Sequence, residues 1–194
     1  YQQLLIYGVH VGHSFANSVL FSSWLVYTFM QNILIINLYK SLIMLKVGFV
    51  GIGNACVFQG PVWFINLDNA SGVYVRHSAK TCGEISWTGR WVNGFISNYI
   101  SLNNLWKRLK YQATNSYKYR QRWAIENRHN WFFTRLSWPR ASFVSSVYSS
   151  FFPVQESLFL GIPCLGVTDT NSAGTYATMS MPGNDDSIIC QVFY

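Results

Sequence analysis

The sequence predicts an α/β fold built on a parallel β-sheet. Short, wholly apolar runs recur along the chain and alternate with longer stretches of helical character. Strands that alternate with helices indicate a parallel sheet. Strands that are covered by helices on both faces are apolar throughout, as these runs are. A chain of 194 residues suits a single domain and can bury a large core.

Turn signals divide the first half of the chain into elements. Asn37 begins a long helical stretch that three glycines weaken, and Gly60 and Pro61 then break the chain. The apolar runs on either side are of strand length. The predicted elements are strands over 20–29 and 33–36, a helix over 38–58, a strand over 62–67, a helix over 71–82 and a strand over 84–88.

The second half contains a strand with a polar tip. In "LGIPCLGVTDTN" (160–171), Gly161 and Pro163 punctuate the chain before an apolar strand that runs to Val167. Ligands of open α/β sheets bind beyond the carboxyl ends of the strands, so the tip could be a catalytic site, a binding surface or only a strand end. The other predicted elements are a helix over 94–109 with Asn93 as a candidate cap, an apolar run over 141–147, a helix around 154–160, a long turn after 171 and a last helix from Asp185.

Composition narrows the classes of partner. The formal net charge is +7, 18% of the residues are aromatic and only 11% are charged. A basic excess favours nucleic acid or an anionic membrane surface. Residues 1–39 and 47–67 contain no Lys, Arg, Asp or Glu, so a polytopic membrane protein with spanning helices in residues 15–67 is an alternative. Gln, Asn, His and Pro interrupt both runs, which weighs against spanning.

Three constellations that could carry chemistry also have plainer interpretations. "GIGNAC" (51–56) echoes a dinucleotide fingerprint, but it lies inside a predicted helix rather than at the start of one. In "PGNDD" (182–186), Asn184 or Asp185 can cap the next helix, whereas neighbouring acids diverge and suit acid–base catalysis poorly. His10 and His13 could ligate a metal, but the sequence offers no third ligand nearby.

The four cysteines and the serines point to no reactive centre. The cysteines form no C-x-x-C pair, and three of them lie in apolar runs, where free Cys behaves as a small hydrophobe. The sequence also lacks the G-x-S-x-G elbow of an α/β hydrolase. We therefore predict four reduced core thiols: Cys56, Cys82, Cys164 and Cys190.

The segment 106–140 carries the strongest functional signal. It holds nine of the fourteen basic residues against one acid, Glu126, and aromatic residues are interleaved with the cations. Lys and Arg neutralise phosphates, and aromatic rings stack on unpaired bases. A merely solvated helical hairpin normally mixes both signs of charge. The segment therefore favours RNA binding over an ordinary solvated face.

The motifs, taken in order, resemble one family. "GVHVGHS" precedes "NILIINLYKSLIML", "GPVWFINLDNAS" and "GRWVNGFISN" follow, and "LGIPCLGVTDTN" and "MPGNDDSI" close the chain. Over nearly its whole length the chain is similar in this order to the small-subunit ribosomal protein S-two family of bacteria and organelles. The combination is highly specific, although no single motif is.

The resemblance implies both a fold and a function. The implied fold is a flavodoxin-like, Rossmann-type parallel sheet flanked by helices, a single domain over 1–194 with a projecting basic helical hairpin at about 104–138. The implied function is that of a structural constituent of the small ribosomal subunit, between head and body near the messenger exit region. Its partners would be small-subunit ribosomal RNA and neighbouring ribosomal proteins. Enzymatic activity, cofactors, metals, a small-molecule substrate and membrane spans are not expected.

The resemblance also carries over particular residues. By motif, the tip at Asp169 becomes a strand end and a contact surface rather than a catalytic site. The matching loop residues are Gly8, His10, Gly12, His13, Asp169, Thr170, Asn171, Pro182, Gly183, Asn184, Asp185 and Asp186. The predicted RNA-binding residues are Arg90, Trp91, Asn98, Trp106, Lys107, Arg108, Lys110, Lys118, Arg120 and Arg122.

The sequence departs from the family pattern in several places. "TFMQN" stands where the family has a basic, Gly-containing turn, and "SSVYSSFF" replaces charged residues after the strand at Ala141. The abundance of Phe, Tyr, Ile, Asn and Ser indicates a drifting, A/T-rich organelle gene and hence a mitochondrial ribosome. Two alternatives stay open: the membrane protein described above, and a nucleotide-dependent α/β enzyme that uses the 51–56 glycines or the tip at Asp169.

Overall fold

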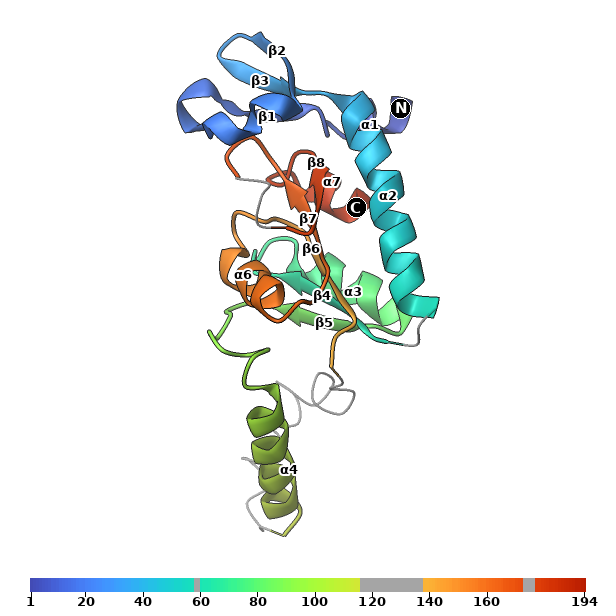
Figure 1. Ribbon diagram of the computed structural model, residues 1–194, viewed down its shortest axis with the longest axis vertical. Coiled ribbons are helices and arrows are strands. Elements are labelled where there is room, and N and C mark those ends of the chain that lie inside the picture. The colour runs from blue at the N-terminus through green and yellow to red at the C-terminus, as the bar shows by residue number, and fades with distance from the viewer. Residues whose placement is uncertain (58–59, 116–137, 173–176) are drawn as a thin grey trace.

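A small antiparallel sheet, a parallel sheet and a projecting helix follow one another along the long axis of the molecule (Figure 1). The computed structural model describes residues 1–57, 60–115, 138–172 and 177–194. The small sheet has the order β1-β3-β2 and lies at the end opposite the projecting helix. Its strands are β1 (Val11–Ser14), β2 (Val26–Met30) and β3 (Ile33–Ile36), with short 3-10 turns at Phe15–Asn17 and Leu20–Leu25.

The central sheet has five parallel strands in the order β5-β4-β6-β7-β8. This is the flavodoxin-like order, so the predicted fold class is confirmed. The chain moves outward from β4 in one direction and then, from β6, in the other. The point where the direction reverses therefore lies between β4 and β6. The strands are β4 (Val62–Asn66), β5 (Ile85–Thr88), β6 (Ala141–Val144), β7 (Cys164–Thr168) and β8 (Met179–Pro182).

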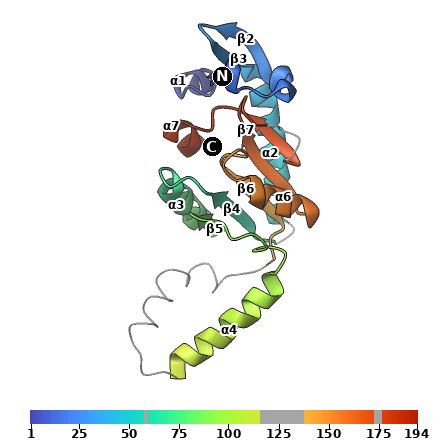
Figure 2. The same ribbon diagram turned by 90° about the vertical axis from the view of Figure 1, so that its left-hand side faces the viewer.

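Helices cover both faces of the parallel sheet (Figure 2). Helix α6 lies on one face and α3 and α7 lie on the other, as expected when the direction of travel reverses. Helix α4 extends away from the sheet. The helices are α1 (Gln2–Ile6), α2 (Leu38–Val57), α3 (Gly72–Cys82), α4 (Tyr99–Asn115), α6 (Phe151–Phe159) and α7 (Ile188–Phe193).

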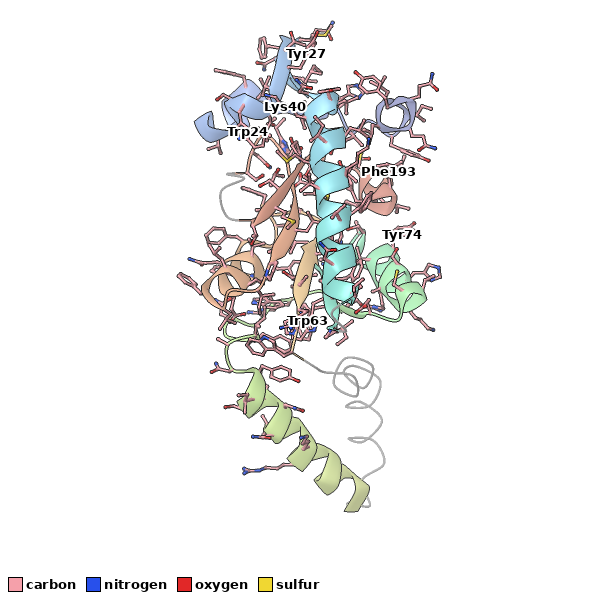
Figure 3. All side chains as sticks on the ribbon, turned by 45° about the vertical axis from the view of Figure 1, so that its right-hand side comes forward. Trp24, Tyr27, Lys40, Trp63, Tyr74 and Phe193 are labelled. Carbon is pink, nitrogen blue, oxygen red and sulfur yellow. The ribbon has the colours of Figure 1, made fainter. Side chains whose placement is uncertain are left out.

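Two hydrophobic cores lie on the two faces of the sheet. Successive side chains of a strand point to opposite faces, so Trp63 and Ile65 of β4 pack with Val154 of α6, whereas Phe64 packs with Leu45 of α2. The strands are apolar throughout because both of their faces are covered. Figure 3 shows the side chains between α2 and the sheet; Trp63, labelled near the lower end of the sheet, belongs to the core on the other face.

The structure corrects three of the predicted elements. Residues 20–25 form a 3-10 turn rather than a strand. The helix predicted from 94 begins only at Tyr99, and Gly94 itself, with a φ of +83°, lies outside helical geometry. The predicted long turn after 171 contains β8, a short edge strand that pairs with β7 alone. Its sequence, "MSMP", carries a weak strand signal because an edge strand needs neither continuous apolarity nor a free N–H at its last residue.

The predicted hairpin and domain layout extend past the described residues. Helix α4 is the first arm of the predicted hairpin, while residues 116–137 lie outside the described part of the chain. The single domain over 1–194 with an insertion at about 104–138 stays a prediction. All four cysteines are free, as predicted, but Cys56 and Cys82 are exposed at the ends of α2 and α3, so the prediction of core positions is wrong for these two.

The segment considered as membrane-spanning is mostly not helical. Residues 11–36 form the small sheet and its 3-10 turns. Among the described residues, one helix, α2, is long and apolar enough to cross a membrane by length and composition. Its inner side packs on the parallel sheet through Leu45, which lies in the core with Leu165 and Met181.

Candidate functional site

Three motif loops that are far apart in sequence meet at the carboxyl edge of β7. The backbone N–H of His13 donates to the hydroxyl oxygen of Thr170 at 2.9 Å. The backbone N–H of Asn184 donates to the carbonyl of Val9 at 3.1 Å. A Cβ atom at position 12 would lie only 2.9 Å from the Thr170 methyl carbon and 3.0 Å from a backbone oxygen. Glycine is therefore required at position 12 for this loop to reach the strand end.

The imidazole of His13 lies at the centre of the contact between these loops. Its Nδ1 lies 3.1 Å from a carboxylate oxygen of Asp169, and its Nε2 lies 2.9 Å from a carboxylate oxygen of Asp186. The side-chain amide of Asn171 lies 3.2 Å from the same Nε2. The hydrogen bond to Asp169 and the charges of both carboxylates outweigh partial burial and raise the pKa of His13 to about 9. The ring is therefore a cation at neutral pH.

Asp185 is buried and, unlike Asp169 and Asp186, has no ion pair with His13 among the described contacts. Its carboxylate accepts a hydrogen bond from the Ser146 hydroxyl at 2.6 Å, and its carbonyl accepts one from the side-chain amide of Gln191. Burial raises the pKa of Asp185 to about 7, against the opposing effect of Ser146. Asp185 and Asp186 thus diverge, as the sequence predicts, and they do not form an acid–base pair.

Asn184, rather than Asp185, organises the entry to α7. Its side-chain oxygen accepts hydrogen bonds from the backbone N–H groups of Asp186 at 3.0 Å and Ser187 at 3.1 Å. This is the local side-chain bonding that holds a turn. The prediction that either residue caps the helix is corrected in part, because Asn184 closes the turn just before α7 and Asp185 is turned inward.

Polar side chains of the chain itself bond to one another at the place where such folds bind ligands. Doubly wound sheets bind ligands at the carboxyl edge where the strand order reverses, which here lies between β4 and β6. At this place the amide of Asn66 donates to the Ser71 hydroxyl at 2.6 Å and to Gln191 at 3.4 Å. The pair of Ser146 and Asp185 lies at the end of β6. Several polar groups at the reversal point are thus bonded to one another, while the buried Ser145 hydroxyl and Oδ1 of Asp185 have no hydrogen-bond partner within the described residues.

The same loops are poorly suited to hold a metal or a nucleotide. Both ring nitrogens of His13 face carboxylates, so the ring is protonated and has no lone pair for a metal. Across the described part of the chain, no group of three or more His, Cys, Asp or Glu side chains is arranged to hold a metal ion. "GIGNAC" lies within α2, as predicted, where its glycine at 51 makes room for Met179, 2.7 Å from the place of an added Cβ.

A large cavity lies away from the motif loops. It has a volume of about 570 Å³ and is lined by residues at the amino ends of β6 and β7, by the second half of α2, and by Trp138. The carboxyl edge of the sheet, where the motif loops meet, is at the other end of these strands. The motif loops and this cavity therefore do not form one site.

The predicted RNA-binding residues fall into three groups. Arg90, Asn98, Lys107 and Arg108 are exposed, whereas Trp91 is only 8% exposed and packs against the rings of Trp87 and Phe95, so its inclusion is corrected to a core role. Exposure alone does not test the RNA-binding prediction for Arg90, Asn98, Lys107 and Arg108. Trp106 and Lys110 lie on α4, and Lys118, Arg120 and Arg122 lie outside the described residues.

Sequence reasoning missed the partners that hold the loops. Ser146, Gln191 and Asn66 complete the polar network, but each stands in an apolar or unremarkable stretch of sequence. The only local signal is that Asn66 ends a buried apolar strand, where a polar residue needs a partner. The pairing of His13 with Asp169 joins residues 156 positions apart, which spacing alone does not reveal.

Comparison with known proteins includes all three motif loops in one family match. The chain matches the family model described as Ribosomal protein S2 over residues 4–194. It is 25% identical to the small ribosomal subunit protein uS2 of Blochmanniella floridana over 201 residues, which cover 96% of this chain and 87% of that protein. It is 27% identical to the protein of the same name from Wigglesworthia glossinidia brevipalpis (93% and 81% covered) and 26% identical to that of Acidiphilium cryptum (100% and 80% covered).

Proposed function

Because the chain belongs to the ribosomal protein S2 family, whose members are structural constituents of the small ribosomal subunit, we propose that it binds small-subunit ribosomal RNA through α4. Helix α4 extends beyond the sheet (Figure 2), and its residues Lys107 and Arg108 are exposed. Its sequence contains no acidic residue. An exposed cationic helix without balancing acids is suited to a phosphate backbone. This projection of α4 is the observation that carries the proposal.

Neutralising α4 tests this proposal directly. The triple variant Lys107→Gln, Arg108→Gln, Lys110→Gln is expected to weaken binding to small-subunit RNA and to lower the slope of log affinity against log salt by about one unit per lost phosphate contact. The matched control is Lys46→Gln, Arg76→Gln, Lys80→Gln, which removes the same charge from α2 and α3. If both triple variants kept the wild-type salt slope, α4 would not be the RNA-binding element.

We further propose that the chain acts as a scaffold rather than as an enzyme, contacting RNA and neighbouring proteins between head and body near the messenger exit region. The support is that His13, Asp169 and Asp185 are engaged in holding loops together. A thermal-shift titration with adenine nucleotides and nicotinamide dinucleotides is expected to leave the melting temperature unchanged. A saturable rise would contradict the scaffold role, because a ligand that binds the folded state stabilises it.

The proposed location is the mitochondrial ribosome. The support is compositional, since the chain is rich in Phe, Tyr, Ile, Asn and Ser and poor in acids, whereas the relatives named above are bacterial. Sedimentation of a lysate of purified mitochondria, with and without magnesium chelation, tests it. The chain should migrate with the small subunit and should lose this position on chelation. A chain absent from the organelle, or left at the top of both gradients, would contradict the proposal.

A further inference from the structure

Helix α2 carries apolar stripes on two opposite sides. One stripe is buried on the parallel sheet, through Leu38, Leu45 and Gly48. The other faces solvent, and its members recur every three or four residues except at Asn54. A helix that is apolar all round is normally covered on all sides. The members of the outer stripe and their exposed fractions are Tyr39 67%, Ile43 45%, Val47 50%, Val50 64% and Val57 76%.

The outer stripe ends in a hollow beside the start of α2. A cavity of about 390 Å³ is lined there by Tyr39, by Leu5 of α1 and by Tyr27 of β2, among others. Figure 3 shows Tyr27 and Lys40 together at this end of the helix. A pocket that takes one large side chain at the end of an apolar stripe is a typical anchor point of a protein interface.

The charges around the stripe favour one kind of occupant. Helix α2 contains no acidic residue. Lys40 on one side of the stripe is held by Trp24, to whose carbonyl it donates and over whose ring it lies at 5.9 Å. Lys46, on the other side, is exposed. An occupant therefore needs an apolar stripe of its own and an acidic group beside it.

RNA and a lipid bilayer fit this surface less well. The exposed stripe is made of aliphatic and aromatic side chains, with only Lys40 and Lys46 beside it, whereas a phosphate backbone needs many cations. A lipid bilayer would cover the apolar stripe but would leave the hollow at Tyr39 without a side chain to fill it. The inner stripe of α2 is also fixed on the sheet, so the helix presents only one side.

We propose that an amphipathic helix of a neighbouring small-subunit protein packs along the outer stripe of α2. Ridges of side chains spaced by three or four residues interlock when two helices pack. The partner helix inserts a large apolar side chain into the hollow at Tyr39 and places an Asp or Glu next to Lys46. The location in the small subunit follows from the family, whereas the docking surface is inferred only from the exposed residues of this chain.

Site-specific photo-crosslinking in assembled small subunits identifies the occupant. A photoreactive phenylalanine replaces Val47 or Val50, and the crosslinked peptide is sequenced after purification of the subunit. The expected peptide comes from a small-subunit protein and carries apolar residues at helical spacing with at least one acid among them. The same probe at Lys80, exposed on α3, is the control and should not yield that peptide. Crosslinks to ribosomal RNA, to lipid or to a second copy of this chain, or no crosslink in subunits that contain the chain, would overturn the proposal.

Charged substitutions in the stripe measure its contribution to assembly. The double variant Val47→Glu, Val50→Glu is expected to compete roughly tenfold less well than the wild type for incorporation into small subunits. Val73→Glu, at an apolar position of α3 that is 66% exposed, is the matched control and should compete normally. Urea unfolding and RNA binding of the free chain should be unchanged, which separates this interface from the RNA-binding role of α4. If glutamate impairs folding, Val47→Ser, Val50→Ser replaces it, and wild-type incorporation of a folded double variant would refute the proposal.

Discussion

At the scale of single residues, His13 joins the amino-terminal loop to the sheet through two unequal ion pairs. Asp169 is 1% exposed, whereas Asp186 is 72% exposed. A buried carboxylate that loses its partner stays desolvated and unpaired, which is costly. An exposed carboxylate that loses its partner is solvated by water at little cost. The pair with Asp169 therefore contributes most of what His13 adds to stability.

The substitution His13→Gln is expected to lower the free energy of unfolding by about 2 kcal/mol, because it leaves the Asp169 carboxylate without its cation. Urea unfolding of the purified chain measures the change. The control is His77→Gln on the exposed side of α3, which should be nearly neutral, and Asp186→Asn should cost less than about 1 kcal/mol. Equal losses for His13→Gln and His77→Gln would show that the ion pair adds nothing.

The same residue makes stability depend on pH in alkaline solution. The pKa of His13 is raised from 6.5 to about 9 by folding, so its contribution is complete below pH 6.5 and is lost as pH rises to about 9. Stability should fall with pH between these values, with a slope below the single-group limit of about 1.4 kcal/mol per pH unit because water partly screens the ring. Urea unfolding at a series of pH values measures the slope. His13→Gln should remove it, and a slope that persisted in the variant would have to come from another group.

Asp185 extends this pH dependence to lower pH. Burial raises the pKa of Asp185 from 3.8 to about 7, so the unfolded chain ionises first. Stability should then fall as pH rises from about 4 to about 7. The two groups titrate in different windows but with the same sign. The wild-type chain should therefore lose stability from weakly acidic to alkaline pH, and the variant His13→Gln should keep only the acidic part of this dependence.

At the scale of elements, the sequence was a good guide wherever one pattern determined one element. The buried strand predicted at 62–67 is β4, and the helix predicted at 38–58 is α2 up to Val57. Prediction failed where an element depends on pairing with a neighbour. Strand β8 exists because it pairs with β7 at the edge of the sheet, and its own residues carry little strand signal.

The glycines of α2 show how packing overrides helix propensity. A Cβ atom at position 48 would lie 2.7 Å from a methyl carbon of Leu165, whereas a Cβ at position 53 would have no neighbour within 4 Å. Gly53→Ala should therefore stabilise the protein by up to about 1 kcal/mol through propensity. Gly48→Ala should destabilise it by about 1 kcal/mol, since overpacking outweighs the same gain. Thermal unfolding of both variants measures the difference, and equal stabilisation would mean that Leu165 moves aside at no cost.

At the scale of the whole molecule, the chain presents two chemically different surfaces. Helix α4 is cationic and extends from one end, while the outer stripe of α2 is apolar and runs along the side (Figure 1). The motifs allowed the family and the fold class to be anticipated from sequence, but not the meeting of the motif loops at one edge of the sheet. The outer stripe could not be anticipated, because the apolar pattern of α2 is the same whether its second side is covered or exposed. Only the packing of α2 on the sheet shows which side of the helix is buried.

The two surfaces should respond differently to salt during assembly. Phosphate contacts weaken steeply with salt, whereas apolar contacts are nearly insensitive to it. In reconstituted small subunits, the loss caused by Lys107→Gln, Arg108→Gln, Lys110→Gln should be largest in low salt and should shrink as salt rises. The loss caused by Val47→Glu, Val50→Glu should be similar at both salt concentrations. Incorporation measured at two salt concentrations for both variants separates the surfaces. If the α2 variant followed the salt dependence of the α4 variant, the two surfaces would be contacting the same polyanion, and α2 would be part of the RNA interface.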